Sequence, residues 1–417
     1  MIPLLQRPLM LLTGLAFSLV LCLAAATPCL SADHTPDNAP ATLPFADVAE
    51  RARGTQVRWY MYGGWAHVND WVDTYVAGEM KKRYNINLVR VPMDAGVFVN
   101  KLLNEKAAGK AVGNIDLLWI NGENFKNARE AGLLFGPFAD RLPNVEKFVD
   151  PASVSHDFGY PVDGYEAPYG RAQFVFEYDT AQAGTPPADL AALKAWIMEN
   201  PGRFTYPQPP DFTGSAFIRQ VLYAVTGGHD QYMAGWDPDL FAEKSPLLWK
   251  WLNDIEPYLW QKGRTYPKDS AFLDTLFSRG EVAFGMSYHP SHAQNKIIEG
   301  SYPDTARTFV LRDGSIFNTH FTAIPFNAPN KAGAMVLADF LISADAQLSK
   351  YQPDNWGDFP ALDLERLPEK ERERFRAVDL GPATLGSDVL GPLAVPEIPS
   401  AYLEALEQGW KAHVLDR

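Results

Sequence analysis

The stretch IDLLWINGENF, residues 115–125, changes from apolar to polar within a few positions. Its first half contains Ile115, Leu117, Leu118 and Ile120, a near-continuous apolar run that is typical of a strand buried on both faces. The second half, residues 121–124, reads Asn-Gly-Glu-Asn and comes directly before a segment with a helical pattern. The stretch therefore predicts a core strand whose end presents hydrogen-bonding groups.

The residues before this strand alternate between predicted strands and predicted helices. The apolar periodicity predicts strands over residues 56–62 and 85–91, and helices over residues 69–84 and 97–108. Such an alternation predicts an α/β fold with a parallel sheet covered by helices on both faces. Ligands of these sheets bind beyond the carboxyl ends of the strands. We therefore expect Gly63-Gly64-Trp65 and residues 121–123 to border one crevice.

The N-terminal residues have the pattern of a secretory signal peptide. Arg7 is the only charge before Asp33, and an apolar run of about 15 residues ends in Ala24-Ala25-Ala26. This run is shorter than the roughly 20 residues that span a bilayer. We predict a signal peptide over residues 1–26, with cleavage as late as residue 32, a tether over residues 33–54, and a periplasmic location.

Cysteine positions and net charge exclude several classes of function. Cys22 and Cys29 lie in or beside the leader, so the folded part has neither a disulfide nor a thiol nucleophile. Leu21 and Pro28 occupy positions where lipid attachment usually requires a small residue, which argues against a lipid anchor. A net charge of −13 argues against nucleic acid as a partner.

Several segments together resemble the family 1 extracellular solute-binding proteins, the periplasmic receptors of ATP-driven importers. They are DLLWINGENF, FVFEYD, GEVAFGMSY, AIPFNAPNKAGAMVLADFLIS and YQPDNWGD, and the likeness covers nearly all of residues 55–365. Within this family the chain is similar to a branch related to thiamine, polyamine and iron receptors. The most specific part is residues 322–343, where a strand and a Pro-Asn-Lys turn lead into a helix.

The resemblance implies a type II periplasmic-binding-protein fold, in which crossover strands join two α/β lobes with a ligand cleft between them. Carried over to this sequence, the first lobe takes residues 55–175 and 322–350, and the second takes residues 178–317 and 355–417. Residues 173–179 and 320–325 would be the crossings. The resemblance also implies a monomer that closes on a small molecule and delivers it to an inner-membrane ABC permease with its cytoplasmic ATPase, without enzymatic activity or a cofactor.

Two motifs have alternative interpretations. TGSAF, residues 213–217, stands at a predicted helix start, where backbone N–H groups could hold an anion, or where Thr213 or Ser215 could be an ordinary N-cap. His289 and His292 could suggest a metal site, but the intervening Pro breaks helical spacing, so we expect solvent-exposed loop histidines and no metal. The chain also lacks the Tyr-Tyr pair that iron receptors of the related branch carry.

The candidate ligand-binding residues combine carboxylates with aromatic rings. They are Trp65, Asn121, Glu123, Glu166, Tyr206, Gly214, Ser215, Tyr288, Trp356 and Asp358. Arg171 is the only nearby cation that we expect among them. Ring faces attract cations, and a buried carboxylate requires a charge or a donor, so this set favours an organic cation such as a thiamine-like or polyamine-like compound.

Two other classes of function are alternatives to a receptor. An exported hydrolase acting on a small substrate or a saccharide would be revealed by turnover. A surface adhesion or scaffold protein would show no rise in melting temperature with a ligand, whereas a receptor should.

Overall fold

The computed structural model describes residues 42–416, and the predicted leader and the beginning of the predicted tether lie outside this range. No helix within the described residues is long and apolar enough to cross a membrane. Residues 45–52 were expected to belong to the tether, but they form helix α1 (Phe45–Ala52). Val48 and Ala52 on its inner side are buried, and the helix packs against α13 (Lys331–Leu341), which explains the difference.

The first lobe is built on a seven-stranded mixed sheet within the described residues, with the order β12-β11-β3-β1-β2 and with β4 and β7 paired to β11. Strands β1 and β2 are parallel, as are β1 and β3, whereas β11 runs antiparallel to β3. The strands are β1 (Gln56–Met61), β2 (Asn87–Pro92), β3 (Leu117–Ile120), β4 (Leu134–Phe135), β7 (Glu166–Gln173), β11 (Ser315–Pro325) and β12 (Ala394–Pro396).

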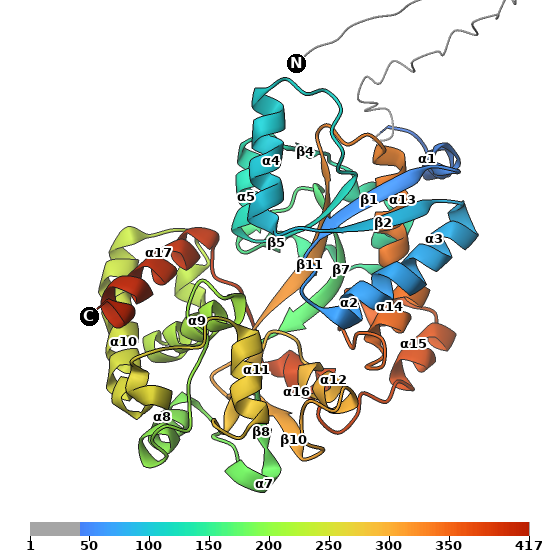
Figure 1. Cartoon of the computed structure of the whole chain (residues 1–417). Coiled ribbons are helices and arrows are strands. Elements are labelled where there is room, and N and C mark those ends of the chain that lie inside the picture. Colours follow the sequence, from blue (N-terminus) through green and yellow to red (C-terminus); the bar gives the residue numbers. More distant parts are fainter. Residues whose placement is uncertain (1–41, 417) are drawn as a thin grey trace, which may run out of the picture. The chain divides into compact units, whose positions relative to one another are not determined.

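Helices cover both faces of this sheet, as the alternation predicts (Figure 1). Successive side chains of a strand point to opposite faces, so Trp59 joins one apolar cluster and Tyr60 joins the other. Helices α4 (Ala95–Ala107) and α5 (Glu123–Glu130) cover the face of Tyr60. The opposite face is covered by α1, α13, α2 (Ala66–Asp70), α3 (Ala77–Tyr84), α6 (Pro143–Phe148), α14 (Ala344–Tyr351) and α15 (Glu369–Arg376). A π-helical turn connects α2 to α3.

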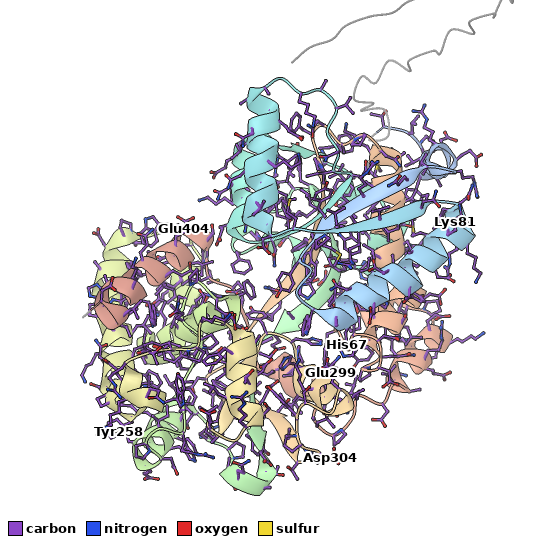
Figure 2. The ribbon with its side chains drawn as sticks, in the orientation of Figure 1. His67, Lys81, Tyr258, Glu299, Asp304 and Glu404 are labelled. Carbon is purple, nitrogen blue, oxygen red and sulfur yellow. The ribbon has the colours of Figure 1, made fainter. Side chains whose placement is uncertain are left out.

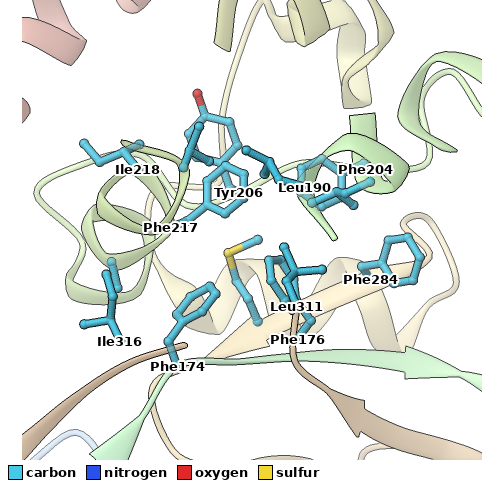
Figure 3. Packing of buried hydrophobic residues seen from close by; sticks show 14 of the residues in the cluster. Phe174, Phe176, Leu190, Phe204, Tyr206, Phe217, Ile218, Phe284, Leu311 and Ile316 are labelled. Atoms are coloured by element: carbon cyan, nitrogen blue, oxygen red, sulfur yellow. The ribbon is translucent and has the colours of Figure 1, made fainter. Parts of the chain in front are cut away.

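The second lobe surrounds a smaller antiparallel sheet with the order β10-β8-β9. Its strands are β8 (Val175–Asp179), β9 (Phe284–Ser287) and β10 (Ala306–Phe309). Its helices are α7 (Thr180–Ala183), α8 (Leu190–Glu199), α9 (Phe212–Thr226), α10 (Pro238–Ile255), α11 (Ser270–Ser278), α12 (His292–Ile298), α16 (Ser387–Leu390) and α17 (Ser400–Trp410). Aromatic side chains dominate the core of this lobe (Figure 3).

The chain crosses between the lobes first at two neighbouring places, and again between Phe375 and Ala383. At the first, β7 of the larger sheet is followed after Phe174 by β8 of the smaller sheet, and the Phe174 N–H donates to the Ile316 carbonyl. The return crossing begins with β11 at Ser315, earlier than the predicted residue 320, because β11 pairs with β7 along residues 317–323. The first two crossings therefore run through one antiparallel ribbon.

The segment after Asp358 differs from its expected place in the second lobe. Ala361, Leu362, Leu367 and Phe375 pack in the apolar cluster of the first lobe. The chain joins the core of the second lobe from Ala383 onward.

Candidate ligand-binding site

The polar end of strand β3 turns directly into helix α5 at Gly122. Gly122 has φ +63°, a conformation that other residues rarely adopt. Its N–H donates to Oδ2 of the buried Asp157 at 2.6 Å. This turn leaves the neighbouring side chains of Asn121 and Glu123 half-buried, and neither has a hydrogen bond or ion pair with another described residue.

Helix α17 of the second lobe presents further carboxylates to this strand end. Helices α5 and α17 are in contact, and α17 carries Glu404 and Glu407 (Figure 2 labels Glu404). Burial raises the pKa of Glu123, and the charges of Glu407 and Glu404 add to this shift. Burial also raises the pKa of Glu407, whose carboxylate accepts a hydrogen bond from Ser215 at 2.7 Å. Carboxylates from both lobes therefore gather at one place.

The cation that acts on both Glu123 and Glu407 already has a partner. Arg219 of α9 is fully buried and binds Glu397 with two hydrogen bonds, of 2.8 and 2.9 Å. A third donor of the guanidinium binds Oγ of Ser215 at 2.8 Å, and the Tyr288 hydroxyl donates to Glu397 at 2.5 Å. A bidentate pair of this kind is a strong interaction for Arg219, which offsets only part of the raised pKa of Glu123 and Glu407. The carboxylates around Glu123 thus keep a net negative potential.

The start of α9 does not offer free donors to an anion. Asp211, not Thr213 or Ser215, is its N-cap, and Oδ1 of Asp211 accepts from the N–H groups of Thr213 and Gly214 at 3.0 and 2.9 Å. The capping prediction for Thr213 and Ser215 was therefore wrong, because both residues lie inside the first turn. A side chain at Gly214 would begin 1.9 Å from the Pro207 carbonyl oxygen, so this glycine is required by close packing.

Two exposed aromatic rings lie close to carboxylates at the ends of elements from both lobes. Tyr62 at the end of β1 is 53% exposed, and Phe212 at the start of α9 is 46% exposed. The pKa of Tyr62 is raised by its partial burial and then by Asp94, Asp211 and Asp269, which directly precede α4, α9 and α11. Aromatic rings beside like-charged carboxylates form surroundings that suit a cation. The sequence prediction did not include Tyr62 or Phe212.

Trp65 makes contacts across the lobes. Its ring packs against His289 at 4.8 Å and His292 at 6.2 Å between centroids. Beside it, Nε2 of His67 lies 2.9 Å from a Glu299 carboxylate oxygen (Figure 2). This contact lacks the direction of a hydrogen bond.

His289 and His292 are both buried, which corrects the prediction that they are exposed. His292 lies between Glu177 and Asp274, with N···O distances of 2.7 and 3.2 Å, and the Tyr302 hydroxyl contacts both carboxylates. Although burial opposes protonation, the two carboxylates raise the pKa of His292 to about 10. The three side chains are close enough to hold a metal ion, but the imidazolium already occupies the position between the carboxylates.

Other predicted ligand residues lie in the interior. Tyr206 is fully buried in the core of the second lobe, where the Trp410 indole donates to its hydroxyl at 3.0 Å (Figure 3). Glu166 is buried with neither carboxylate oxygen hydrogen-bonded, and its pKa is raised well above the usual value by burial. Trp356 and Asp358 lie beside the crossing strands, where Asp358 pairs with Lys350. Arg171 lies there too, half-buried, and donates to Oγ of Ser153 at 2.8 Å.

Comparison with known proteins now assigns the family. Residues 76–369 match the family described as "Bacterial extracellular solute-binding protein". The chain is also 38% identical over 366 residues to Protein YnjB of Escherichia coli (strain K12), an alignment that covers 87% of this chain and 92% of that protein. The chain is a bacterial extracellular solute-binding protein.

Solved structures of other solute-binding proteins share the fold of this one. An ABC transporter structure from Clostridium perfringens has a TM-score of 0.60 at 16% identity and covers 86% of this chain and 98% of its own. The spermidine/putrescine substrate-binding protein PotD from Streptococcus pneumoniae has a TM-score of 0.59 at 15% identity, with coverage of 86% and 99%. A periplasmic thiamin binding protein has a TM-score of 0.56 at 18% identity, with coverage of 87% and 96%. These likenesses confirm the predicted type II fold.

In a solute-binding protein of this fold, the crossing strands position the two lobes. Gly170 of β7 and His320 of β11 pair at the point where the register of the ribbon shifts. The buried Lys350 and Asp358 lie directly against Gly170. Oδ1 of Asp358 is 3.2 Å from Nε2 of His320. The crossing is therefore supported by buried charges.

Proposed function

We propose that this solute-binding protein captures an organic cation in the periplasm and delivers it, as a monomer, to an ABC permease and its ATPase. The observation that carries the proposal is the half-buried Glu123, which faces Glu404 and Glu407 of the other lobe. Within residues 42–416, Glu123 has no basic partner, since the nearby Arg219 is bound to Glu397. A buried carboxylate without a partner is costly, so a cationic ligand would remove this cost.

Exposed aromatic rings after β1 and at the start of α9 support a cation with an apolar body. Tyr62 and Phe212 are partly exposed, and an aromatic ring attracts a cation by about 0.5–2 kcal/mol. The Arg219 guanidinium already lies 5.9 Å from the Phe212 centroid, so Tyr62 is the ring with no cation of the described residues over it. Asp211 already fills the anion position at the start of α9. The proposed binding set is therefore Asn121, Glu123, Glu407, Tyr62 and Phe212, with Trp65 at its side.

The proposed mechanism is closure of the two lobes on the ligand. Carboxylates from both lobes repel one another when no cation lies between them, and a shared cation shifts the population towards the closed form. The family match favours this receptor over the hydrolase and scaffold alternatives.

Titration of the purified protein tests the proposal. Thiamine, spermidine, sulfate and phosphate are each added while heat and tryptophan fluorescence are followed. We expect at least one organic cation to bind, and Glu123→Gln to weaken it about tenfold or more, since a hydrogen bond to a charged group contributes about 1.5–3 kcal/mol. Glu130→Gln, at the exposed end of the same helix, is the matched control and should leave binding unchanged. Tight binding of an oxyanion that persists in Glu123→Gln would contradict a cation receptor.

A further inference from the structure

The two-residue turn of a small hairpin contacts both lobes. Strands β5 (His156–Asp157) and β6 (Tyr160–Pro161) are joined by Phe158 and Gly159, which have φ +45° and +73°. Positive φ at both positions is the turn that best fits the twist of a hairpin, and Asn-Gly is its preferred sequence. A phenylalanine at the first position is strained, so its side chain must be held there by its surroundings.

The Phe158 side chain is buried in the second lobe, although its hairpin lies among elements of the first. Phe158 is 5% exposed and belongs to the apolar cluster of the second lobe. Its ring packs against Phe212 at 6.4 Å, and the Arg219 guanidinium lies 5.9 Å from its centroid. At the next position, Gly159 approaches Pro399 so closely that a Cβ atom would be 2.9 Å from its ring.

Asp157, directly before Phe158, connects the same turn to the first lobe. Asp157 is buried and accepts the Gly122 N–H, and the Phe158 ring lies 3.5 Å from the position that a Cβ atom of Gly122 would take. Gly122 directly precedes Glu123. One turn thus connects the start of α5, which carries Glu123, to α9 and α17, which carry Phe212 and Glu407.

We infer that Phe158 is a positioning residue, which fixes the spacing between Glu123 and the carboxylates of α17 without touching the ligand. The inference rests on the proposed function for its effect on affinity, but its effect on the contact between the lobes is independent of any ligand. Loss of the ring should increase the mobility of the start of α17 and the start of α5 in the ligand-free protein. It should also weaken a ligand that both lobes share, because more of its binding energy is then needed to bring the lobes together.

The variant Phe158→Asn distinguishes a role of Phe158 in positioning the lobes from a role in folding its own turn. This change creates the preferred Asn-Gly turn and relieves the strain at φ +45°, so a purely structural turn residue would become neutral or better. We expect instead that Phe158→Asn raises amide hydrogen exchange of residues 122–125 and 397–403 about tenfold in the ligand-free full chain. We also expect it to weaken the cation that the wild type binds, thiamine or spermidine, about tenfold. Phe158→Leu, which keeps an apolar side chain, should recover most of both effects.

Asp163→Asn is the control, since Asp163 and Gly164 have φ +48° and +73°, close to those of Phe158 and Gly159, and Asp163 is exposed. It should leave exchange and affinity unchanged. The inference would be overturned if amide hydrogen exchange in Phe158→Asn stayed at the wild-type rate, or if Asp163→Asn raised it equally. If Phe158→Asn does not fold, Phe158→Ala must show the same rise in exchange or the inference fails. If no cation binds the wild type, the proposed ligand class is wrong, while the exchange measurement still decides the role of Phe158.

Discussion

At the scale of single residues, the crossing strands depend on a buried ion pair. Lys350 and Asp358 are both fully buried and in direct contact. Burial lowers the pKa of Lys350 and opposes the charged form of Asp358, but attraction between the two, with His320 nearby, keeps the pKa of Asp358 below its usual value. Each charge is tolerated because the other is present.

Lys350→Met should therefore destabilise the protein strongly. It keeps much of the side-chain volume but leaves Asp358 without its partner, and breaking a buried pair costs about 3–5 kcal/mol. The free energy of unfolding, from denaturant titration near pH 7, measures the loss. Lys268→Met, at a side chain that is 78% exposed, should change it by less than about 0.5 kcal/mol. A Lys350→Met protein as stable as the wild type would show that Asp358 is protonated or solvated in the folded state.

His292 predicts a dependence of stability on pH. Its pKa in the folded protein is about 10, above the ordinary 6.5. The folded state thus holds the proton more tightly, and this stabilisation is complete below about pH 6.5 and is lost as pH rises towards 10. In His292→Gln, this loss of stability between pH 7 and 10 should be absent, as followed by urea unfolding. His229→Gln should retain the wild-type slope, and an unchanged slope in His292→Gln would refute the role of the imidazolium.

At the scale of secondary-structure elements, one aspartate connects two helices of the second lobe. Asp211 caps α9, and its carboxylate also accepts from the N–H and hydroxyl of Ser270 at the start of α11. Helix α9 carries Arg219 and Ser215, so this cap also holds the wall of the proposed site.

Asp211→Ala should lower the free energy of unfolding by about 1–3 kcal/mol, because one cap contributes about 1 kcal/mol and two helix starts lose a partner. Thermal unfolding monitored by circular dichroism measures the change. Asp230→Ala, at a side chain that is 98% exposed, should have little effect. Equal stabilities of the two variants would mean that water replaces the Asp211 carboxylate at both helices.

At the scale of the whole molecule, the ribbon of β7 and β11 and the turn at Phe158 both connect the lobes. The crossing strands belong to one sheet, whereas the turn touches the second lobe through packing of Phe158 and close approach of Gly159. Motion between the lobes should therefore bend the ribbon and change the contacts of the turn.

Binding of the cation should decrease the radius of gyration, since carboxylates of both lobes would approach one charge. Small-angle X-ray scattering of the ligand-free and the saturated protein measures this change. Glu123→Gln at the same ligand concentration should show a smaller decrease, and Glu130→Gln the full one. A radius that stays constant at saturation would exclude closure as the response to the ligand.

Apolar periodicity predicted the alternation of strands and helices, and the family resemblance supplied the type II fold. Apolar periodicity is local, so β1, β2, β3 and α4 lie within about two residues of their predicted bounds. Asn121 and Glu123 could be selected because polar groups after a buried strand are visible in the sequence.

Which charges have partners became visible in the folded structure and not in the sequence. The sequence shows that Arg219, Glu397, Asp211 and the two histidines exist, but not that Arg219 binds Glu397 across 178 positions or that Asp211 fills the start of α9. These pairings arise from chain segments that meet only after folding, and burial then sets the pKa of each group. The ligand class depends on the charges that remain without a partner. The fold could therefore be predicted from the sequence, whereas the site required the folded structure.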